Sequence, residues 1–302
     1  MKDYLNFVNE NYPVRRTKAE KALFRDFVLN ELKDSRYSAH TETIGKNNNI
    51  VIGDVNTAKV IFTAHYDTPA TTFIPTFCLP KNKFIRCAYQ FTVPFFIGFF
   101  VGLISILIAL RFDVLMQLPV FLVVSTVIYW GLMVGFKKNK HNKNDNTSGV
   151  AVVMSLANKC ISEKVAFVLF DNEEKGLLGS KAFKKKYKEQ LNDTLVINFD
   201  CVGVGNNIFL VMKKGAQNHA LLKKLEEQVN SSENYNVLYI PYKKAVANSD
   251  YKVFDCGVDV GAYKKKRNIY YMGKIHTKKD TEGYTENIDF LTENMFNFSE
   301  GL

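Results

Sequence analysis

The stretch KVAFVLFDNEE, residues 164–174, joins an apolar run to a pair of acidic side chains, an arrangement that recurs along the chain. The run 164–170 is short, apolar and rich in β-branched residues, which predicts a β-strand. Glu173 and Glu174 follow this strand, and as neighbours their side chains project in different directions. One of them can therefore bind a metal ion while the other faces a water molecule. A buried carboxylate that acts as a base should have a raised pKa.

Short apolar runs and helix-like segments alternate on both sides of this stretch. Further strands are predicted at 59–63, 194–199 and 207–212, and helices at 149–161, 180–191 and 218–229. An earlier helix is predicted from Thr17, an N-cap residue, to about residue 33. The alternation predicts an α/β fold with a central, mostly parallel or mixed sheet and helices on both faces. Open α/β sheets bind ligands at the carboxyl ends of their strands, where three of the motifs lie.

Two more motifs carry potential metal ligands. His65-Tyr66-Asp67-Thr68 follows the strand 59–63, and side chains two apart in an extended segment share a face. His65 can therefore bind a metal while Asp67 holds the imidazole in the required tautomer. Asp145, in Asn144-Asp145-Asn146-Thr147-Ser148-Gly149, comes just before the helix 149–161. The helix dipole favours a carboxylate at that end, and its two oxygens could bridge two ions.

Asp200 and His276 complete two sets of ligands. A two-metal hydrolase needs oxygen and imidazole ligands on each ion, one carboxylate that bridges both, and a free carboxylate for the proton of the attacking water. The chain has a candidate for each of these places. An acidic pair by itself is more often a solvated surface or a helix cap, so the prediction depends on the ordered set and not on any single motif.

Two apolar stretches, 88–110 and 114–136, are separated only by Arg111-Phe112-Asp113. As a helix, each would measure about 34 Å at about 1.5 Å per residue, enough to cross a hydrocarbon layer of about 30 Å. Core helices of soluble proteins rarely run so far without a charge. The two stretches therefore predict a two-helix transmembrane hairpin that interrupts the fold.

Basic residues flank the hairpin on both sides, whereas the connecting turn holds one arginine and one aspartate. They are Lys81, Lys83 and Arg86 before it, and Lys137, Lys138, Lys140 and Lys143 after it. Positive charge collects on the cytoplasmic side of membranes, which predicts an integral membrane protein with both termini and the soluble part in the cytoplasm. The first residues lack the long apolar run of a secretory signal.

The remaining composition is consistent with this prediction. The five cysteines have neither metal-finger nor redox spacing and fit free thiols in a reducing compartment. The net charge of +10 comes without a recognised nucleic-acid motif, so nucleic acid is not an expected partner. A basic surface is expected for a domain held beneath an anionic lipid leaflet.

The sequence resembles the zinc-dependent peptidases of family M28, which are mostly aminopeptidases but include carboxypeptidase-like members and the animal glutaminyl cyclases. The matching motifs are His-Tyr-Asp-Thr (65–68), Asn-Asp-Asn-Thr-Ser-Gly-Val (144–150), Asp-Asn-Glu-Glu-Lys-Gly-Leu-Leu-Gly-Ser (171–180), Asn-Phe-Asp-Cys-Val-Gly (198–203), Ser-Asp-Tyr-Lys-Val-Phe (249–254) and His-Thr-Lys-Lys-Asp-Thr (276–281). Each motif is weak alone, but six of them in order are specific. They extend from about residue 40 to the carboxyl end, apart from the apolar insert.

The resemblance implies a metal-dependent aminopeptidase with two divalent ions, expected to be Zn²⁺. One ion would be bound by His65, Asp145 and Asp200, and the other by Asp145, Glu174 and His276. Glu173 would be the general base, and Asp67 would support His65. Asp250 and Asp280 fit as supporting positions, although a turn or cap role would explain either. Residues 1–80 and 137–302 are expected to form a single catalytic domain around the inserted hairpin, 88–136.

The chain departs from the family pattern between Asp67 and Asp145, which lie 78 residues apart because the hairpin is inserted there. We therefore expect the site to lie near the membrane surface, with part of 69–80 at its rim, and its substrates to be membrane-associated peptides. The spacings Gly98-x-x-x-Gly102 and Gly131-x-x-x-Gly135 leave a homo-oligomer open. Glutaminyl cyclisation, carboxypeptidase-like chemistry and peptide binding without catalysis are the alternatives. The complete ligand set argues against the first and the last.

Overall fold

A mixed sheet forms the centre of the computed structural model, which describes residues 2–72, 76–134 and 137–302. Nine strands of the described chain belong to it. They are β1 (Ala39–Ile44), β2 (Asn47–Ile52), β3 (Val60–His65), β4 (Val165–Phe170), β5 (Leu195–Phe199), β6 (Asn207–Met212), β7 (Asn236–Pro241), β8 (Gly257–Lys266) and β9 (Ile269–Tyr271). Strands from before and after the apolar insert therefore pair in one sheet.

The strand order is β1-β2-β4-β3-β5-β8-β6-β7, with β9 paired to β8. The central strands β4, β3, β5 and β8 run parallel to one another. Antiparallel pairs flank them, with β1, β2 and β4 on one side and β8 and β6 on the other. This confirms the predicted mixed sheet, and it aligns the carboxyl ends of the central parallel strands.

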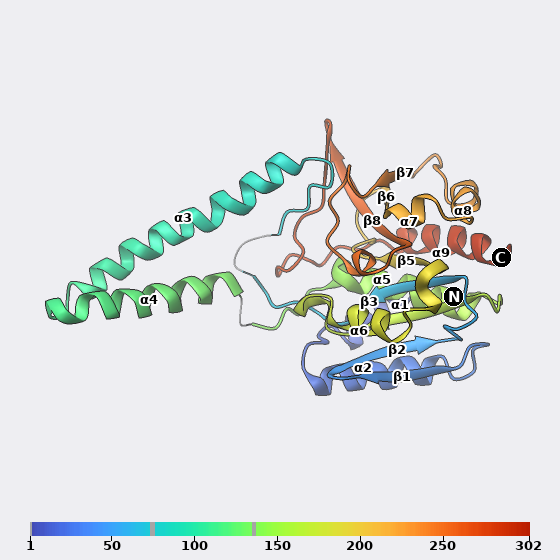
Figure 1. The fold of residues 1–302 in the computed structure, drawn as a ribbon, viewed down its shortest axis with the longest axis horizontal. Helices are drawn as coiled ribbons and strands as arrows, with labels where there is room; N and C mark the ends of the chain where they lie inside the picture. Colours follow the sequence, from blue (N-terminus) through green and yellow to red (C-terminus); the bar gives the residue numbers. More distant parts are fainter. Residues whose placement is uncertain (1, 73–75, 135–136) are drawn as a thin grey trace.

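Helices cover both faces of the sheet (Figure 1). Side chains of β3 alternate between the two faces, since Phe62 packs in one apolar cluster and Ile61 in the other. The helices on the side of Phe62 are α1 (Tyr4–Asn11), α2 (Lys18–Glu31), α5 (Gly149–Lys159), α8 (Leu222–Gln228) and α9 (Thr285–Glu300). On the side of Ile61, Phe183 of α6 (Leu178–Lys186) fills the second cluster. The predicted arrangement of helices on both faces is therefore confirmed.

Most predicted elements lie within one to three residues of the observed ones, but several elements were not predicted. The helix expected at 218–229 is shorter and is observed as α8, after the single turn α7 (Lys214–Gln217). The helix expected at 180–191 is observed as α6, which ends five residues earlier, at Lys186. Strands β1, β2 and β7, of which β1 and β7 lie at the edges of the sheet, carry polar side chains and lack a long apolar run, and β8 and β9 were also not predicted. Short or irregular helical turns complete the chain at Lys143–Ser148, Glu173–Lys175, Gln190–Asp193 and Asp250–Val253.

The apolar insert forms two helices, α3 (Lys83–Ala109) and α4 (Val114–Val134), which project together from the α/β body (Figure 1). Both are long and apolar enough to cross a membrane, and only 11% and 0% of their most apolar windows are buried within the structure. Core helices of a soluble protein would be mostly buried. The first helix begins at Lys83 and not at 88, because the charged residues Lys83 and Arg86 excluded its first turn from the predicted apolar run. The end of the second predicted stretch, 135–136, lies outside the described residues.

Thr17 begins α2 with a capping box. Its hydroxyl oxygen accepts a hydrogen bond from the Glu20 amide at 3.3 Å, and the Glu20 carboxylate accepts one from the Thr17 amide at 2.8 Å. Because Thr17→Ala removes one of these bonds, we expect the free energy of unfolding to fall by about 1 kcal/mol. Urea unfolding of the detergent-purified protein measures the change. The exposed neighbour Lys18→Ala is the control, and an equal loss in both variants would contradict the capping role.

Candidate metal centre

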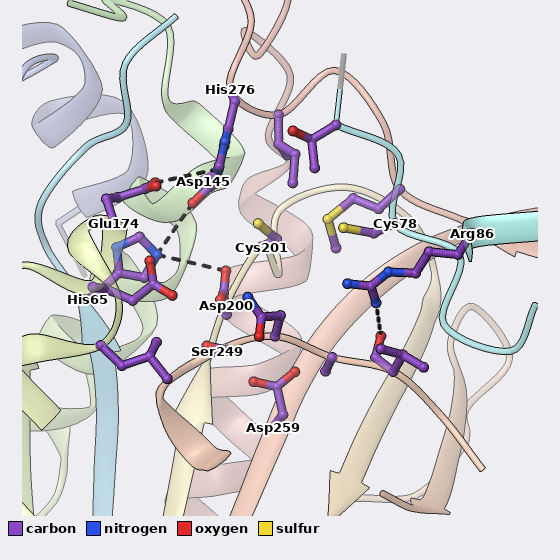
Figure 2. Close-up of a pocket in the computed structure, with 18 of the residues that line it drawn as sticks. His65, Cys78, Arg86, Asp145, Glu174, Asp200, Cys201, Ser249, Asp259 and His276 are labelled. Atoms are coloured by element: carbon purple, nitrogen blue, oxygen red, sulfur yellow. Dashed lines mark hydrogen bonds and ion pairs between the residues drawn. The ribbon is translucent and has the colours of Figure 1, made fainter. Parts of the chain in front are cut away.

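The predicted ligands come together where the parallel strands end. His65 is the last residue of β3, Glu174 follows β4, and Asp200 follows β5. Asp145 precedes α5, and His276 lies in the segment between β9 and α9. All five line one cavity of about 430 Å³. Figure 2 shows their side chains directed toward one another on one side of this cavity.

Asp145 is the residue that both histidines face. Its Oδ1 atom lies 3.3 Å from Nε2 of His65, and its Oδ2 atom lies 2.9 Å from Nε2 of His276. Asp145 and His65 are buried. Each carboxylate oxygen therefore points to a different imidazole, which is the arrangement expected of a carboxylate that bridges two ions.

Two further carboxylates complete the surroundings of each histidine. Oδ1 of Asp200 lies 3.9 Å from Nε2 of His65, and Oε1 of Glu174 lies 3.5 Å from Nε2 of His276. Two groups, His65 with Asp145 and Asp200, and Asp145 with Glu174 and His276, each place their ligand atoms within 4.8 Å of one another. These are the two predicted sets. Glu173 forms a third group with His65 and Glu174.

The donor atoms fit divalent metal ions. Imidazole nitrogens and carboxylate oxygens are the ligands that Zn²⁺ takes in catalytic sites. Oε1 of Glu174 is buried and has no hydrogen-bond partner among the described residues, although a buried carboxylate oxygen normally has one. Two ions in this cluster would satisfy this oxygen and offset the repulsion between its carboxylates.

Burial dominates the electrostatics of the cluster. Desolvation raises the pKa of Glu174 to about 8, and it raises the pKa of Glu173 well above its ordinary value. Desolvation also acts on Asp145, but hydrogen bonds with His276 and His65 more than offset it and lower the pKa of that carboxyl. Asp145 therefore stays charged between the two imidazoles, while a nearby cation would favour the charged forms of Glu173 and Glu174.

Asp67 acts differently from the prediction. The imidazole of His65 places Nδ1 at 3.1 Å from the backbone oxygen of Asp67, whereas the Asp67 carboxylate is 3.7 Å away. That carboxylate accepts hydrogen bonds from the backbone amides of Glu173, at 2.9 Å, and Glu174, at 3.3 Å. Asp67 thus orients His65 through its main chain and fixes the acidic pair through its side chain.

The loop that carries Asp145 is held in place from two directions. The carboxylate of Asp280 accepts hydrogen bonds from the amides of Asn144 and Asp145, both at 3.0 Å, which gives Asp280 a supporting role. The amide group of Asn146 donates to the carbonyl of Phe199 at 2.8 Å and its oxygen accepts from the amide of Gly149. A side chain at Gly149 would collide with the Phe199 carbonyl, so α5 can begin here only with glycine.

Arg15 is a positioning residue that the sequence did not reveal. Its side chain is fully buried and donates hydrogen bonds to the carbonyl of Tyr66 at 2.6 Å and to the hydroxyl of Thr147 at 3.1 Å. Its backbone amide donates to the Thr68 hydroxyl. It therefore joins the loop after His65 to the loop of Asp145. No motif surrounds it in the sequence, and only the tertiary structure identifies it.

Lys21 gives similar support to the acidic pair. From α2, its ammonium group lies 2.5 Å from the Asp171 carboxylate and 2.8 Å from the side-chain oxygen of Asn172, and both Lys21 and Asp171 are buried. Asp171 and Asn172 immediately precede Glu173 in the sequence. A buried ion pair adds little net stability but fixes the position of its partners, since breaking it leaves an uncompensated charge.

Replacing Arg15 should destabilise the whole centre. Arg15→Ala leaves buried acceptors without donors, at a cost of about 1–3 kcal/mol for each. Arg15→Lys should not restore the loss, because lysine lacks the planar fork that reaches two acceptors at once. Urea unfolding measures both variants against Arg16→Ala, a change at the less buried neighbour. Unfolding of Arg15→Ala at the wild-type urea concentration would show that the contacts are dispensable.

Comparison with known proteins agrees with this geometry. The model of peptidase family M28 matches residues 137–298, more than half of the chain, and this range includes Asp145, Glu173, Glu174, Asp200 and His276. His65 and Asp67 precede it. No curated protein sequence matches the chain.

Solved structures show the same fold. The LapA aminopeptidase of Legionella pneumophila superposes with a TM-score of 0.57 at 14% identity, over 98% of this chain and 67% of that chain. The glutaminyl cyclase of Fimbriiglobus ruber superposes with a TM-score of 0.53 at 15% identity, over 98% of this chain and 92% of that chain. At such low identity these likenesses concern the fold alone, and the family match carries the assignment. The chain belongs to peptidase family M28.

Proposed function

We propose that this protein is a membrane-anchored, metal-dependent aminopeptidase that removes amino-terminal residues from peptides at a two-metal site. The observation that carries the proposal is the position of Asp145, whose two oxygens face His65 and His276 within two overlapping ligand groups. A single-metal site would not need a carboxylate shared in this way. Family membership supports peptidase chemistry.

In this proposal His65, Asp145 and Asp200 hold one ion, and Asp145, Glu174 and His276 hold the other. When bound, Zn²⁺ would polarise the scissile carbonyl and lower the pKa of the attacking water. Glu173 lines the same cavity, and among the described residues its carboxylate has no hydrogen-bond partner. It takes the proton from the water and passes it to the leaving amine. The free amino terminus of the peptide is bound by the surrounding carboxylates.

The proposal places the site at the cytoplasmic surface of a membrane. The helices α3 and α4 are the membrane anchor, and basic residues lie at both of their body-proximal ends. Arg86 and Gln90 of α3 line the cavity that holds the metal ligands, so the site adjoins the anchor. Peptides held at or released from the membrane are the proposed substrates. A homo-oligomer through the glycine-containing helix faces stays a prediction.

Glutaminyl cyclisation is the second candidate, because a glutaminyl cyclase shares the fold over nearly its whole length. That likeness concerns the fold, and the second ligand group favours hydrolysis. A peptide with amino-terminal glutamine distinguishes the two, since cyclisation releases ammonia and leaves the peptide bond intact.

The first test is release of free amino acids from short peptides by the detergent-purified protein. We expect release only from free amino termini and its loss on chelation. Glu173→Gln should lower kcat by about 100- to 10,000-fold, because it removes the proton acceptor but no proposed ligand. Metal content per chain should stay unchanged in this variant, and the exposed Glu189→Gln serves as the matched control. Wild-type rates in Glu173→Gln, or release from blocked amino termini, would contradict the mechanism.

The orientation is tested with tags at the two termini and added trypsin. In intact expressing cells both tags should be protected, whereas in inverted membrane vesicles both should be lost, because the basic flanks keep the soluble part in the cytoplasm. A cytoplasmic protein made in the same cells reports lysis. Digestion of either tag in intact cells would refute the topology.

A further inference from the structure

The membrane hairpin contributes a charged side chain to the catalytic cavity. Arg86 lies in the first turn of α3 and lines the cavity together with Gln90, one helical turn further on. In Figure 2 its guanidinium enters from the side opposite His65 and Glu174. One nitrogen of the guanidinium donates a hydrogen bond to the carbonyl of Val246 at 3.2 Å. This bond holds the group at the cavity wall and uses one of its five N–H donors.

Arg86 is also unlike the other ionisable groups around it. The described lining contains two histidines and five carboxylates of Asp and Glu residues, and Arg86 is the one Lys or Arg among them. In the described part of the chain no carboxylate lies within ion-pair distance of its guanidinium. A guanidinium suits a carboxylate because it can donate two parallel hydrogen bonds to it, so the free donors of Arg86 are available to an anionic ligand.

Two simpler explanations do not account for this position. A cation in the first turn of a helix is disfavoured by the helix dipole, so capping does not explain it. Basic residues at the membrane surface need only face water or lipid headgroups, as Lys83 in the same turn does. Arg86 instead lies against the loop of Val246 and borders the cavity.

We propose that Arg86 is a specificity-determining residue that binds a carboxylate of the peptide substrate. The inference rests on the proposed aminopeptidase function and adds a substrate class to it. The acidic side of the cavity suits the ammonium group of a peptide, and the guanidinium on the other side suits a carboxylate. The carboxylate is either the free carboxyl terminus of a short peptide or an acidic side chain next to the scissile bond.

Matched peptides test this with the full-length protein in detergent. Leu-Ala and Leu-Ala-Ala are compared with their carboxyl-terminal amides, and Leu-Glu-amide is compared with Leu-Gln-amide. We expect the wild type to prefer the charged member of one series by about 10- to 100-fold in kcat/KM, mainly through KM, as for a charge-assisted hydrogen bond made in both ground and transition states. The series that shows the preference identifies the source of the carboxylate.

The variants separate the role of Arg86 from a structural one. Arg86→Gln keeps a donor for Val246 but loses the charge, so it should abolish the preference while turnover of the amides persists. Arg86→Lys should retain part of the preference, and Lys83→Gln all of it. Equal rates for charged and amidated peptides in the wild type, or an unchanged preference in Arg86→Gln, would overturn the inference and leave the aminopeptidase function intact.

Binding provides a readout that does not need turnover. In a Glu173→Gln background, isothermal titration calorimetry should give tighter binding of the charged peptide than of its amide, and adding Arg86→Gln should remove the difference. If the protein hydrolyses no peptide, the proposed aminopeptidase function is wrong. The difference in affinity between the charged peptide and its amide still tests whether Arg86 binds a carboxylate. Equal affinities for the two peptides would overturn it.

Discussion

The position of the Asp145 carboxylate between two imidazoles is the constraint on which the rest of the structure depends. The group is buried, and each of its oxygens faces a different histidine. Placing it beside three further carboxylates is costly in a medium of low polarity unless cations are present. Arg15 offsets part of this cost with a buried positive charge nearby, while the Asp280 carboxylate accepts a hydrogen bond from the Asp145 amide and fixes the loop. The remaining cost is the physical reason to propose that the cluster binds metal ions.

The sheet is built so that this constraint can be met. Strands β4, β3 and β5 are parallel neighbours, so their carboxyl ends, and the residues that follow them, reach one edge together. Each strand is an apolar run followed directly by polar ligands, and that local pattern is visible in the sequence. This is why these strands and the mixed sheet could be predicted before the structure was known, and why the candidate ligands His65, Asp145, Glu174, Asp200 and His276 could be named and are found together.

Contacts between distant single residues could not be predicted in the same way. Arg15 and Lys21 lie in segments without metal ligands, and they act through hydrogen bonds to loops more than 50 residues away. In Asp67 the backbone oxygen contacts His65, whereas the carboxylate binds the amides of Glu173 and Glu174. This division depends on the backbone conformation, which the spacing of residues in the sequence does not reveal. Polar edge strands such as β1 carry no apolar run, so hydrophobic periodicity missed them. Local patterns thus predicted the candidate ligands, whereas the contacts that hold these residues became visible only in three dimensions.

The hairpin shows how an insertion can change a site without touching its ligands. The helix α3 begins five residues before its apolar run, and this first turn places Arg86 in the cavity wall. Because the same helix is the proposed anchor, its angle to the body determines both the distance of the site from the lipid and the shape of the cavity. Under the proposed function, a motion of the hairpin against the loop of Val246 would therefore alter substrate binding while leaving the candidate metal ligands in place.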